Sequence, residues 1–291
     1  MKKVLSVACA LCMTTAMLTG CGSSNNAGTA ATGEAQNSAA ASTTTEQAST
    51  ATDAGTTLIA LITMDSLDQH WVTLNEGAQK AAAELGVTVQ FMAPNTKDDA
   101  QQIECVNNAV SAGAQAIIVA ANGPDAISSA LREASDAGVK LIYVDSPANV
   151  SAEATFSTDN NAAGKTAGEE MKKALADAGV TSGSIGIINV NAATDSCVMR
   201  EEGFRSAFEG TDFELLETQY GEGDAAKSQS IAENYITQGV VGIFGCNEGS
   251  TTGAGNAIKA SGKDNVIGVG FDKSDACLLY TSPSPRDMRR S

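Results

Sequence analysis

Short apolar runs alternate with amphipathic segments along the chain from about residue 57. The run Leu58–Met64 is almost uninterrupted, which is typical of a strand that is covered on both faces in a parallel sheet. A polar stretch, Asp65–His70, follows it, and Trp71–Leu85 then repeats apolar residues at helical spacing. Strand, polar loop and helix in this order form the first half of a β-α-β unit. The stretch therefore predicts an α/β fold in which the polar loop lies at the carboxyl end of a strand.

The same alternation continues to residue 157. The further predicted strands are Val87–Met92, Ala116–Ala120, Leu141–Val144 and Ala154–Ser157, and the further predicted helices are Asp98–Ala112 and Asp125–Ala137. Gly86, Gly113 and Gly138 follow the helices at the position where a left-handed residue commonly ends a helix. These elements predict one doubly wound parallel sheet of about five strands.

A second set of elements begins after Asp159-Asn160-Asn161, which is a good cap for a helix over Ala162–Ala178. The predicted strands of this set are Ser184–Asn191, Phe213–Tyr220, Val240–Phe244 and Val266–Gly270, and its other helices are Cys197–Phe208, Ala225–Gln238 and Ser250–Ala260.

The two sets resemble one another. The segment Asn75–Ala78 on the first helix of the first set recurs as Glu201–Phe204 on a helix of the second set. The pattern predicts two Rossmann-like lobes with parallel sheets, residues 57–158 and 159–276, joined by a hinge near Thr158.

The start of the chain has the features of a targeting segment. Residues 1–20 combine two lysines with a short apolar region, which predicts a signal peptide. Leu18-Thr19-Gly20-Cys21 matches the bacterial lipobox, which implies cleavage before Cys21 and lipidation of its thiol; an ordinary signal peptide is the alternative. Residues 21–56 are rich in Ala, Thr, Ser, Gly and Asn and predict a disordered tether. Such a chain is anchored to a membrane and does not span it.

The end of the chain departs from the rest in composition. Residues 277–291 lack periodicity and carry three of the chain's arginines, so we interpret them as a non-native tail; the alternative is a real basic tail.

Composition excludes some ligands. The net charge of −16 and the pI of about 4.4 argue against binding to nucleic acid or to an anionic membrane surface. Three of the seven cysteines, Cys9, Cys12 and Cys21, lie in or directly after the leader, and Cys105, Cys197, Cys246 and Cys277 are scattered. Their spacing predicts neither a metal site nor a disulfide framework.

Two nucleotide-like motifs fail on inspection. Gly164-Lys165-Thr166 lacks the earlier glycine of a phosphate loop, because Asp159 stands there, and it falls within a predicted helix. Gly253-Ala254-Gly255 continues to Ile258 where a dinucleotide motif needs glycine.

Catalytic patterns are also missing from the sequence. His70 is the only histidine, and no Gly-x-Ser-x-Gly segment occurs. We therefore predict a binding protein without cofactor or metal, and not an enzyme.

Polar side chains follow the strand ends of both predicted lobes. They are Asp65 and Asp68 after the first strand, Asp145 after the fourth, Asn247 after Val240–Phe244, Asp272 after Val266–Gly270, and Arg200 on the helix after Ser184–Asn191. Ligands of open parallel sheets bind outside the carboxyl ends of the strands. Planar polar groups that contact adjacent hydroxyls, together with one aromatic ring such as that of Trp71, suit a carbohydrate. Trp71 alone is equally well explained as a core residue.

These residues resemble those of the type I periplasmic sugar-binding proteins, and most closely the ribose-binding group. The resemblance covers about Leu58–Asp275 and rests on four segments: Asn75–Gln79, Ser157–Asn160, Arg200–Phe204 and Gly268–Asp272.

The resemblance implies a role for each candidate residue. It places Asp68 at a polar sugar contact, His70 and Trp71 at an aromatic pair, Asp145 at the acid after the fourth strand, Arg200 at the guanidinium, Asn247 and Asp272 at second-lobe contacts, and the first hinge crossing near Thr158-Asp159.

Three positions depart from the family pattern. Met64 replaces a small polar residue, Ser146 replaces an arginine beside Asp145, and Gly223 stands where an aromatic residue is usual. Two of these losses remove contacts to ribose, so a larger pyranose or a polyol would use the space. The family's return crossings would come after Asp275, so we also expect an incomplete second lobe.

The resemblance implies the extracytoplasmic, lipid-anchored substrate-binding component of an ABC sugar importer. A monomer would capture a sugar between two lobes and deliver it to the permease. A sugar-responsive repressor would need an N-terminal helix-turn-helix, and an enzyme on a Rossmann-like sheet would need a nucleotide motif. A sensor accessory that presents a bound ligand to a membrane receptor remains open.

Overall fold

The computed structural model describes residues 56–272. The chain divides into two units, Met1–Thr52 and Asp53–Ser291, and every described residue belongs to the second unit. The predicted signal peptide, Cys21, nearly all of the tether and the tail 277–291 lie outside the described residues.

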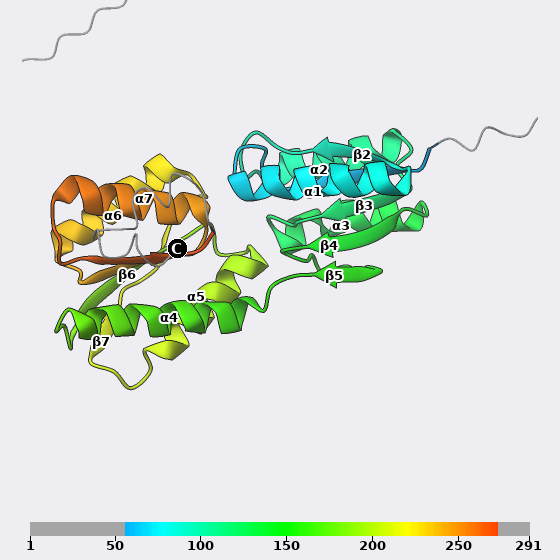
Figure 1. Ribbon diagram of the computed structural model, residues 1–291. Helices are drawn as coiled ribbons and strands as arrows, with labels where there is room; N and C mark the ends of the chain where they lie inside the picture. The colour runs from blue at the N-terminus through cyan, green and yellow to red at the C-terminus, as the bar shows by residue number, and fades with distance from the viewer. Residues whose placement is uncertain (1–55, 273–291) are drawn as a thin grey trace, which may run out of the picture. The chain divides into compact units, whose positions relative to one another are not determined.

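The first sheet has five parallel strands, as the sequence predicted, and their order is β2-β1-β3-β4-β5 (Figure 1). Its strands are β1 (Leu58–Ile62), β2 (Thr88–Met92), β3 (Ala116–Val119), β4 (Lys140–Val144) and β5 (Ala154–Phe156), and its helices are α1 (Gln69–Leu85), α2 (Asp99–Ser111) and α3 (Pro124–Asp136). Helices α2 and α3 cover one face, where Val106, Ile127 and Leu131 pack against Ile62 and Ile117. We call this sheet and its helices the first lobe.

Helix α1 is less buried than its apolar pattern predicted. Trp71 and Ala82 are buried, but Ala81 is exposed and Leu85 is 75% exposed. The helix packs chiefly against β2, which is an edge strand, so the sheet covers only part of the predicted apolar face.

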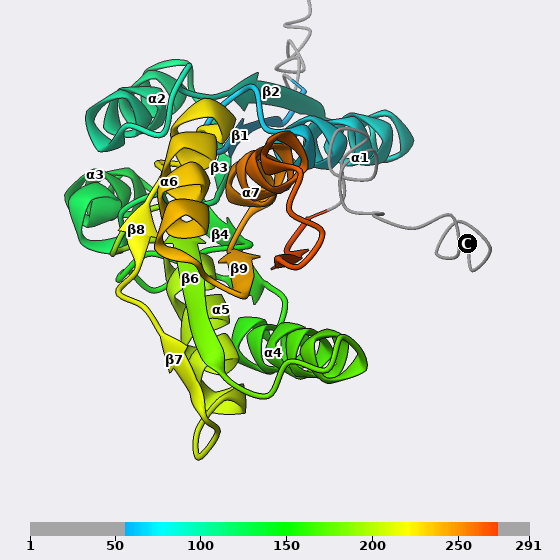
Figure 2. The ribbon, with the colours of Figure 1, turned by 90° about the vertical axis from the view of Figure 1, so that its left-hand side faces the viewer.

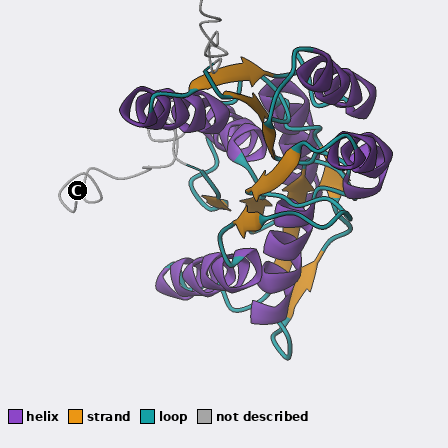
Figure 3. Cartoon of the chain, turned by 90° about the vertical axis from the view of Figure 1, so that its right-hand side faces the viewer, coloured by secondary structure: helices purple, strands orange, loops and turns teal. Residues whose placement is uncertain are grey.

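The second sheet is also parallel, in the order β10-β9-β6-β7, with β8 paired to β6. Its strands are β6 (Gly183–Asn189), β7 (Phe213–Leu215), β8 (Gln219–Tyr220), β9 (Gly242–Gly245) and β10 (Ile267–Gly270), and its helices are α4 (Asn160–Asp177), α5 (Asp195–Ala207), α6 (Ala225–Gln238) and α7 (Glu248–Ser261). Helices α4 and α5 lie on one side of the sheet and α6 and α7 on the other (Figures 1 and 2). We call this sheet and its helices the second lobe. Figure 3 shows helices flanking the strands within the described residues.

The prediction of one strand over Phe213–Tyr220 is wrong, because the chain forms two short strands there. Side chains donate hydrogen bonds to backbone carbonyls of the residues between these two strands. Arg205 donates to the Leu216 carbonyl at 3.0 Å, and the Tyr235 hydroxyl donates to the Glu217 carbonyl at 2.7 Å. These bonds occupy groups that a continuous strand would pair along the sheet.

Two glycines allow α4 and α5 to pack closely. A Cβ at Gly164 would lie 2.0 Å from the Arg200 carbonyl oxygen, and a Cβ at Gly203 would lie 2.0 Å from the Asn161 carbonyl oxygen. Gly164-Lys165-Thr166 therefore lies inside α4, where Gly164 serves helix packing and no phosphate loop exists. Because α5 carries Arg200, this contact also fixes the height of Arg200 along α4.

Candidate functional site

A cavity of about 20 Å³ lies where the carboxyl ends of strands from both lobes meet. It is lined by Met64, Asp68, His70, Trp71, Lys97, Asp145, Val190, Ser196, Cys197, Arg200, Asn247 and Asp272. We call it the inner cavity. The structure brings all seven predicted ligand-binding residues to this cavity, and their contact with a ligand stays a prediction. Asp65 is buried in the same loop as Asp68 but does not line the cavity.

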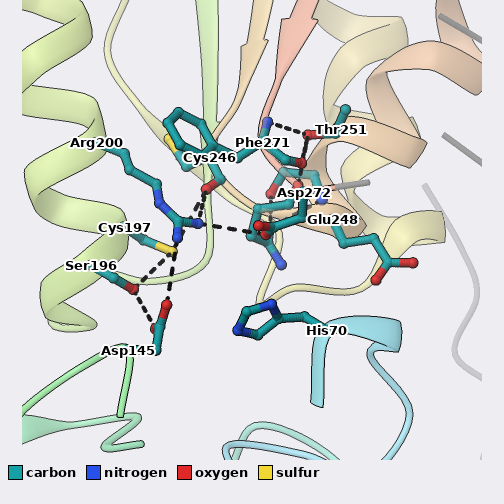
Figure 4. A network of polar contacts seen from close by, with 12 residues as sticks. His70, Asp145, Ser196, Cys197, Arg200, Cys246, Glu248, Thr251, Phe271 and Asp272 are labelled. Carbon is teal, nitrogen blue, oxygen red and sulfur yellow. Dashed lines mark hydrogen bonds and ion pairs between the residues drawn. The ribbon is translucent and has the colours of Figure 1, made fainter. Parts of the chain in front are cut away.

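The guanidinium of Arg200 lies between two carboxylates (Figure 4). Its Nη2 is 3.5 Å from an oxygen of Asp145, in the first lobe, and its Nη1 is 3.5 Å from an oxygen of Asp272, in the second. Burial raises the pKa of Asp272, and the charge of Arg200 partly offsets that rise. Arg200 remains charged, because burial disfavours its charged form less than its acidic neighbours favour it, and its pKa is raised.

Neutral groups hold the rest of Arg200 in place. Its Nε donates to Asn160 at 2.9 Å, and its Nη1 donates to the Cys246 carbonyl at 3.0 Å. The guanidinium carbon lies 4.5 Å from the centre of the Phe271 ring, a cation–π distance. Asn160 opens α4 directly after the crossing between the lobes, so the crossing and Arg200 are linked by one hydrogen bond.

Ser146 and Ser196 connect Asp145 to the start of α5. The Ser196 hydroxyl donates to Asp145 at 2.9 Å, and the Ser196 backbone N–H donates to the Ser146 hydroxyl at 3.3 Å. The two hydroxyl oxygens lie 2.7 Å apart and both residues are buried. Ser146, which the sequence singled out as a departure from the family pattern, therefore links the first lobe to the second.

Trp71 is a buried core residue that also lines the inner cavity, and its contact with a ligand stays a prediction. It is 3% exposed, packs against Met64 and Ala120, and meets the His70 ring edge-on at 4.6 Å. Its indole Nε1 is buried and has no hydrogen-bond partner among the described residues. An unsatisfied buried donor is costly, so this N–H is well suited to a ligand oxygen.

Asn247 has the same property in the second lobe. Its side-chain oxygen caps α7 by accepting from the Ser250 N–H at 3.1 Å, and it accepts from the Ser250 hydroxyl at 2.7 Å. Its Nδ2 is buried without a hydrogen-bond partner in the described part of the chain. The cavity thus has one such donor from each lobe.

Lys97 is a cavity residue that the sequence reasoning missed. Its ammonium group forms an ion pair with Asp65 and lies 3.5 Å from Asp68, and its side chain is 6% exposed. Burial acts to lower the pKa of Lys97, but the charges of Asp65 and Asp68 outweigh burial, and the pKa is raised. Two acids after one buried strand need a nearby cation, and Lys97 follows the neighbouring strand β2, which is the signal that could have found it.

Asp68 joins the two lobes at the edge of the cavity. It caps α1 by accepting from the His70 N–H at 3.0 Å. Burial acts to raise its pKa, but a hydrogen bond with the Glu248 side chain and the charge of Lys97 outweigh burial, and the pKa is lowered. Glu248 also accepts from the Gln69 N–H at 3.0 Å.

The cavity thiol is not a nucleophile at neutral pH. Burial raises the pKa of Cys197 to about 11, so the thiol stays protonated. Cys105, Cys197 and Cys246, the three cysteines within residues 56–272, are all free. In those residues no group of three or more His, Cys, Asp or Glu side chains could hold a metal ion, and no helix is long and apolar enough to cross a membrane.

The arrangement suits the binding of hydroxyl groups. Asp68, Asp145 and Asp272 accept hydrogen bonds, while Arg200, Lys97, Trp71 and Asn247 donate them. Each hydroxyl of a sugar can donate to a carboxylate and accept from an N–H group, so alternating donors and acceptors in a small space match a polyhydroxylated ligand.

Two parallel α/β lobes with their strand ends facing one cavity define the class of two-lobed solute-binding proteins. Residues 59–282 match the periplasmic binding protein domain family, and the chain belongs to this family. The ribose import binding protein RbsB of Haemophilus influenzae is 30% identical over 230 residues, which cover 78% of this chain and 76% of that protein. The relatives of this chain are import binding proteins. The chain therefore belongs to a family of binding proteins and not of enzymes, as predicted.

Solved structures support the same fold. A carbohydrate transporter solute binding protein from Agrobacterium radiobacter, in complex with D-arabinose, is 27% identical with a TM-score of 0.74 and covers 78% of this chain and 79% of its own. The XylFII–LytSN complex contains a chain that is 25% identical with a TM-score of 0.71, covering 77% of this chain and 82% of its own. The predicted fold class is confirmed by these structures.

Proposed function

We propose that this protein is an extracytoplasmic, lipid-anchored binding protein that captures a neutral sugar or polyol and delivers it to an ABC importer. The observation that carries this proposal is the inner cavity, where Arg200 lies between carboxylates of both lobes and two buried donors, Trp71 Nε1 and Asn247 Nδ2, have no partner among the described residues. The ribose import and D-arabinose-bound relatives support a carbohydrate as the ligand class.

Ligand entry requires the lobes to separate. The inner cavity of about 20 Å³ is far smaller than the ~300–1,000 Å³ of ordinary ligand pockets. The bonds between Ser146 and Ser196 and between the Thr194 hydroxyl and the Asn122 carbonyl, at 2.8 Å, join the lobes beside the cavity. A hinge motion that opens the far side would admit a sugar, and closing would return Arg200 and Asp145 to contact with it.

The test is a panel of neutral pentoses, hexoses and polyols, with binding measured by Trp71 emission and by calorimetry. Since Trp71 is the chain's single tryptophan, its emission reports on the cavity directly. We expect at least one sugar to bind with a Kd near the micromolar range, roughly −8 kcal/mol. If no sugar or polyol changes the emission or releases heat, the proposed ligand class is wrong.

The lipid anchor is a separate part of the proposal. Leu18-Thr19-Gly20-Cys21 and the polar segment after it support lipidation at Cys21. Cys21→Ala should move the protein from the membrane fraction to the soluble fraction, whereas Cys105→Ala, a matched control, should leave it on the membrane. Equal membrane association of both variants would contradict the anchor.

A second candidate function is presentation of the bound sugar to a membrane receptor. It is favoured by one observation: a relative of similar fold, XylFII, has been solved in complex with LytSN. Deleting the protein from its host separates the two functions. Loss of sugar uptake supports the importer role; intact uptake with loss of a sugar-induced response supports the receptor role.

A further inference from the structure

A second, larger pocket adjoins the inner cavity. It has a volume of about 630 Å³ and is formed by loops of both lobes. The first lobe contributes Asp65, Leu67, Asp68 and Asn95–Asp98 to its lining. The second lobe contributes Glu222–Ala225, Lys227, Glu248, Gly249 and Thr252. We call it the outer pocket. Asp68 and Lys97 line both spaces, so the two are neighbours that share a wall.

We propose that the ligand has two linked units: a sugar ring that binds in the inner cavity and a second uncharged, hydroxylated unit that binds in the outer pocket. The ligand class is then a disaccharide or a comparable glycoside. This inference rests on the proposed function and names the kind of sugar that the site takes.

The outer pocket offers polar groups that are already oriented. Asp98 caps α2 by accepting from the Gln101 N–H at 2.8 Å, and Asp224 caps α6 by accepting from the Lys227 N–H at 2.7 Å. One oxygen of each carboxylate makes the cap. The other oxygen of each carboxylate can accept from a ligand hydroxyl, and the cap holds the carboxylate in position for it.

Thr252 provides independent evidence for a ligand. Its hydroxyl oxygen is buried and has no hydrogen-bond partner among the described residues, and Thr252 lines the outer pocket. A buried hydroxyl without a partner is costly. A hydroxyl of the second unit could satisfy it, just as the first unit could satisfy Trp71 Nε1 and Asn247 Nδ2 in the inner cavity.

The charges of the outer pocket disfavour an anionic second unit. Its acids are Asp65, Asp68, Asp98, Glu222, Asp224 and Glu248, and its only cations are Lys97 and Lys227. Lys97 is paired with Asp65, and Lys227 is paired with Glu222 at 2.5 Å. A phosphate or uronate in this pocket would meet an excess of negative charge, whereas hydroxyls would meet acceptors.

Two lining glycines, Gly223 and Gly249, sit where a side chain would collide with a neighbour. A Cβ at Gly223 would lie 2.8 Å from Nζ of Lys97, and Gly223 has a φ of 72°, which a side chain disfavours. A Cβ at Gly249 would lie 1.8 Å from the Gly223 carbonyl oxygen, so Gly249 lets the Gly223 loop rest against α7. A side chain at position 223 would project into the outer pocket and displace Lys97.

The test uses the full protein and calorimetry with paired ligands: each monosaccharide that binds, and a disaccharide with that same ring at one end. We expect the fitting disaccharide to bind about tenfold tighter than its monosaccharide, because it satisfies the Thr252 hydroxyl and an added carboxylate. The same ring carrying a phosphate should bind at least about tenfold more weakly than the disaccharide.

Filling the outer pocket should remove only the advantage of the second unit. Ala225→Trp places an indole in the pocket. Ala226→Trp is the control, because Ala226 is exposed and does not line the pocket. Ala225→Trp should reduce the affinity for the disaccharide to that for the monosaccharide. Ala226→Trp should leave both affinities unchanged. Both variants should bind the monosaccharide within about twofold of the parent protein.

A second pair guards against misfolding of the tryptophan variant. Thr252→Val keeps the side-chain shape and removes the hydroxyl, and Thr237→Val does the same near the far end of α6. We expect weaker disaccharide binding, about threefold to tenfold, for Thr252→Val alone. Monosaccharides that bind as tightly as every disaccharide, or disaccharide binding unaffected by Ala225→Trp and Thr252→Val, would overturn the inference while leaving the proposed function intact. Failure of every sugar to bind would instead overturn the proposed function.

Discussion

Asp145 and Asp272 occupy equivalent positions in the two lobes and contact the same guanidinium, that of Arg200, through its two terminal nitrogens. Asp145 follows β4, and Asp272 closely follows β10. In the first sheet one strand, β3, separates β4 from β1, and in the second sheet one strand, β9, separates β10 from β6. Both acids have left-handed backbones, with φ of 61° and 67°, which side-chain-bearing residues rarely adopt. Such conformations persist where the surrounding structure enforces them, typically at functional sites.

Arg200→Ala should weaken ligand binding by about 2–5 kcal/mol, because it leaves buried ligand hydroxyls and both acids without their common cation. The same change should lower the free energy of unfolding by about 3 kcal/mol, since it breaks buried ion pairs. Calorimetry and urea unfolding measure the two effects. Arg132→Ala is the control, because Arg132 is exposed on α3.

The two measurements separate the role of Arg200 in ligand binding from its role in stabilising the folded protein. A variant that loses stability but binds a confirmed sugar as tightly as the parent would place Arg200 in the structure of the site and outside its ligand contacts.

Trp71→Phe tests the indole N–H apart from the aromatic face. Phenylalanine keeps a ring against Met64 and His70 but removes Nε1, which has no partner among the described residues. Loss of one neutral hydrogen bond to a ligand should cost about 0.5–1.5 kcal/mol of binding. Calorimetry replaces fluorescence here, because the variant has no tryptophan. Tyr220→Phe is the control, because it removes a hydroxyl outside the cavity and should leave the ligand affinity unchanged. Equal affinity of both variants would contradict a ligand contact at Nε1.

The periodicity of the chain was enough to predict both sheets, because buried parallel strands and amphipathic helices have distinct apolar patterns. The carboxyl ends of those strands then suggested Asp68, Asp145, Asn247 and Asp272, which line one cavity in the structure; their contact with a ligand stays a prediction. The break between Phe213 and Tyr220 was not predictable. It depends on hydrogen bonds from Arg205 and Tyr235, which only the folded chain brings to that backbone.

Sequence reasoning also missed residues whose role depends on a partner distant in the chain. Lys97 reads as an ordinary loop lysine until β2 is placed beside β1 and its ammonium reaches Asp65. Gly77 and Gly203 occupied matching positions in the repeated segment, yet their surroundings differ entirely.

That difference gives a matched pair of variants. A Cβ at Gly77 would meet nothing within 4 Å, so Gly77→Ala should stabilise the protein by roughly 0.5–1 kcal/mol through its helix. A Cβ at Gly203 would lie 2.0 Å from the Asn161 carbonyl oxygen, so Gly203→Ala must push α5 away from α4. We expect it to cost about 1–3 kcal/mol of stability and to weaken sugar binding, because Arg200 moves with α5. Urea unfolding and calorimetry check both; equal effects of the two substitutions would contradict the close packing of α4 and α5.

Lys97→Met tests the buried cation between the two lobes' loops. Methionine keeps the apolar length of the side chain but leaves Asp65 and Asp68 without their cation, so the free energy of unfolding at pH 7 should fall by about 3–5 kcal/mol. The pKa of Lys97 is raised in the folded protein. The contribution of its charge is therefore fully present below the unfolded pKa of about 10.5 and is lost as the pH rises through the folded pKa.

The pH dependence distinguishes this charge from simple packing. The stability difference between the parent and Lys97→Met should be constant from pH 7 to about 10 and should narrow above about 10.5, where the unfolded parent chain releases the Lys97 proton that the folded protein still holds. Other groups that titrate in this range, such as Tyr235 with a pKa raised to about 12, are present in both proteins and cancel in the difference. Lys140→Met is the control, because Lys140 pairs with Glu153 on the exposed surface. A Lys97 difference that stays constant through the alkaline range would show that packing, and not the charge, accounts for the loss.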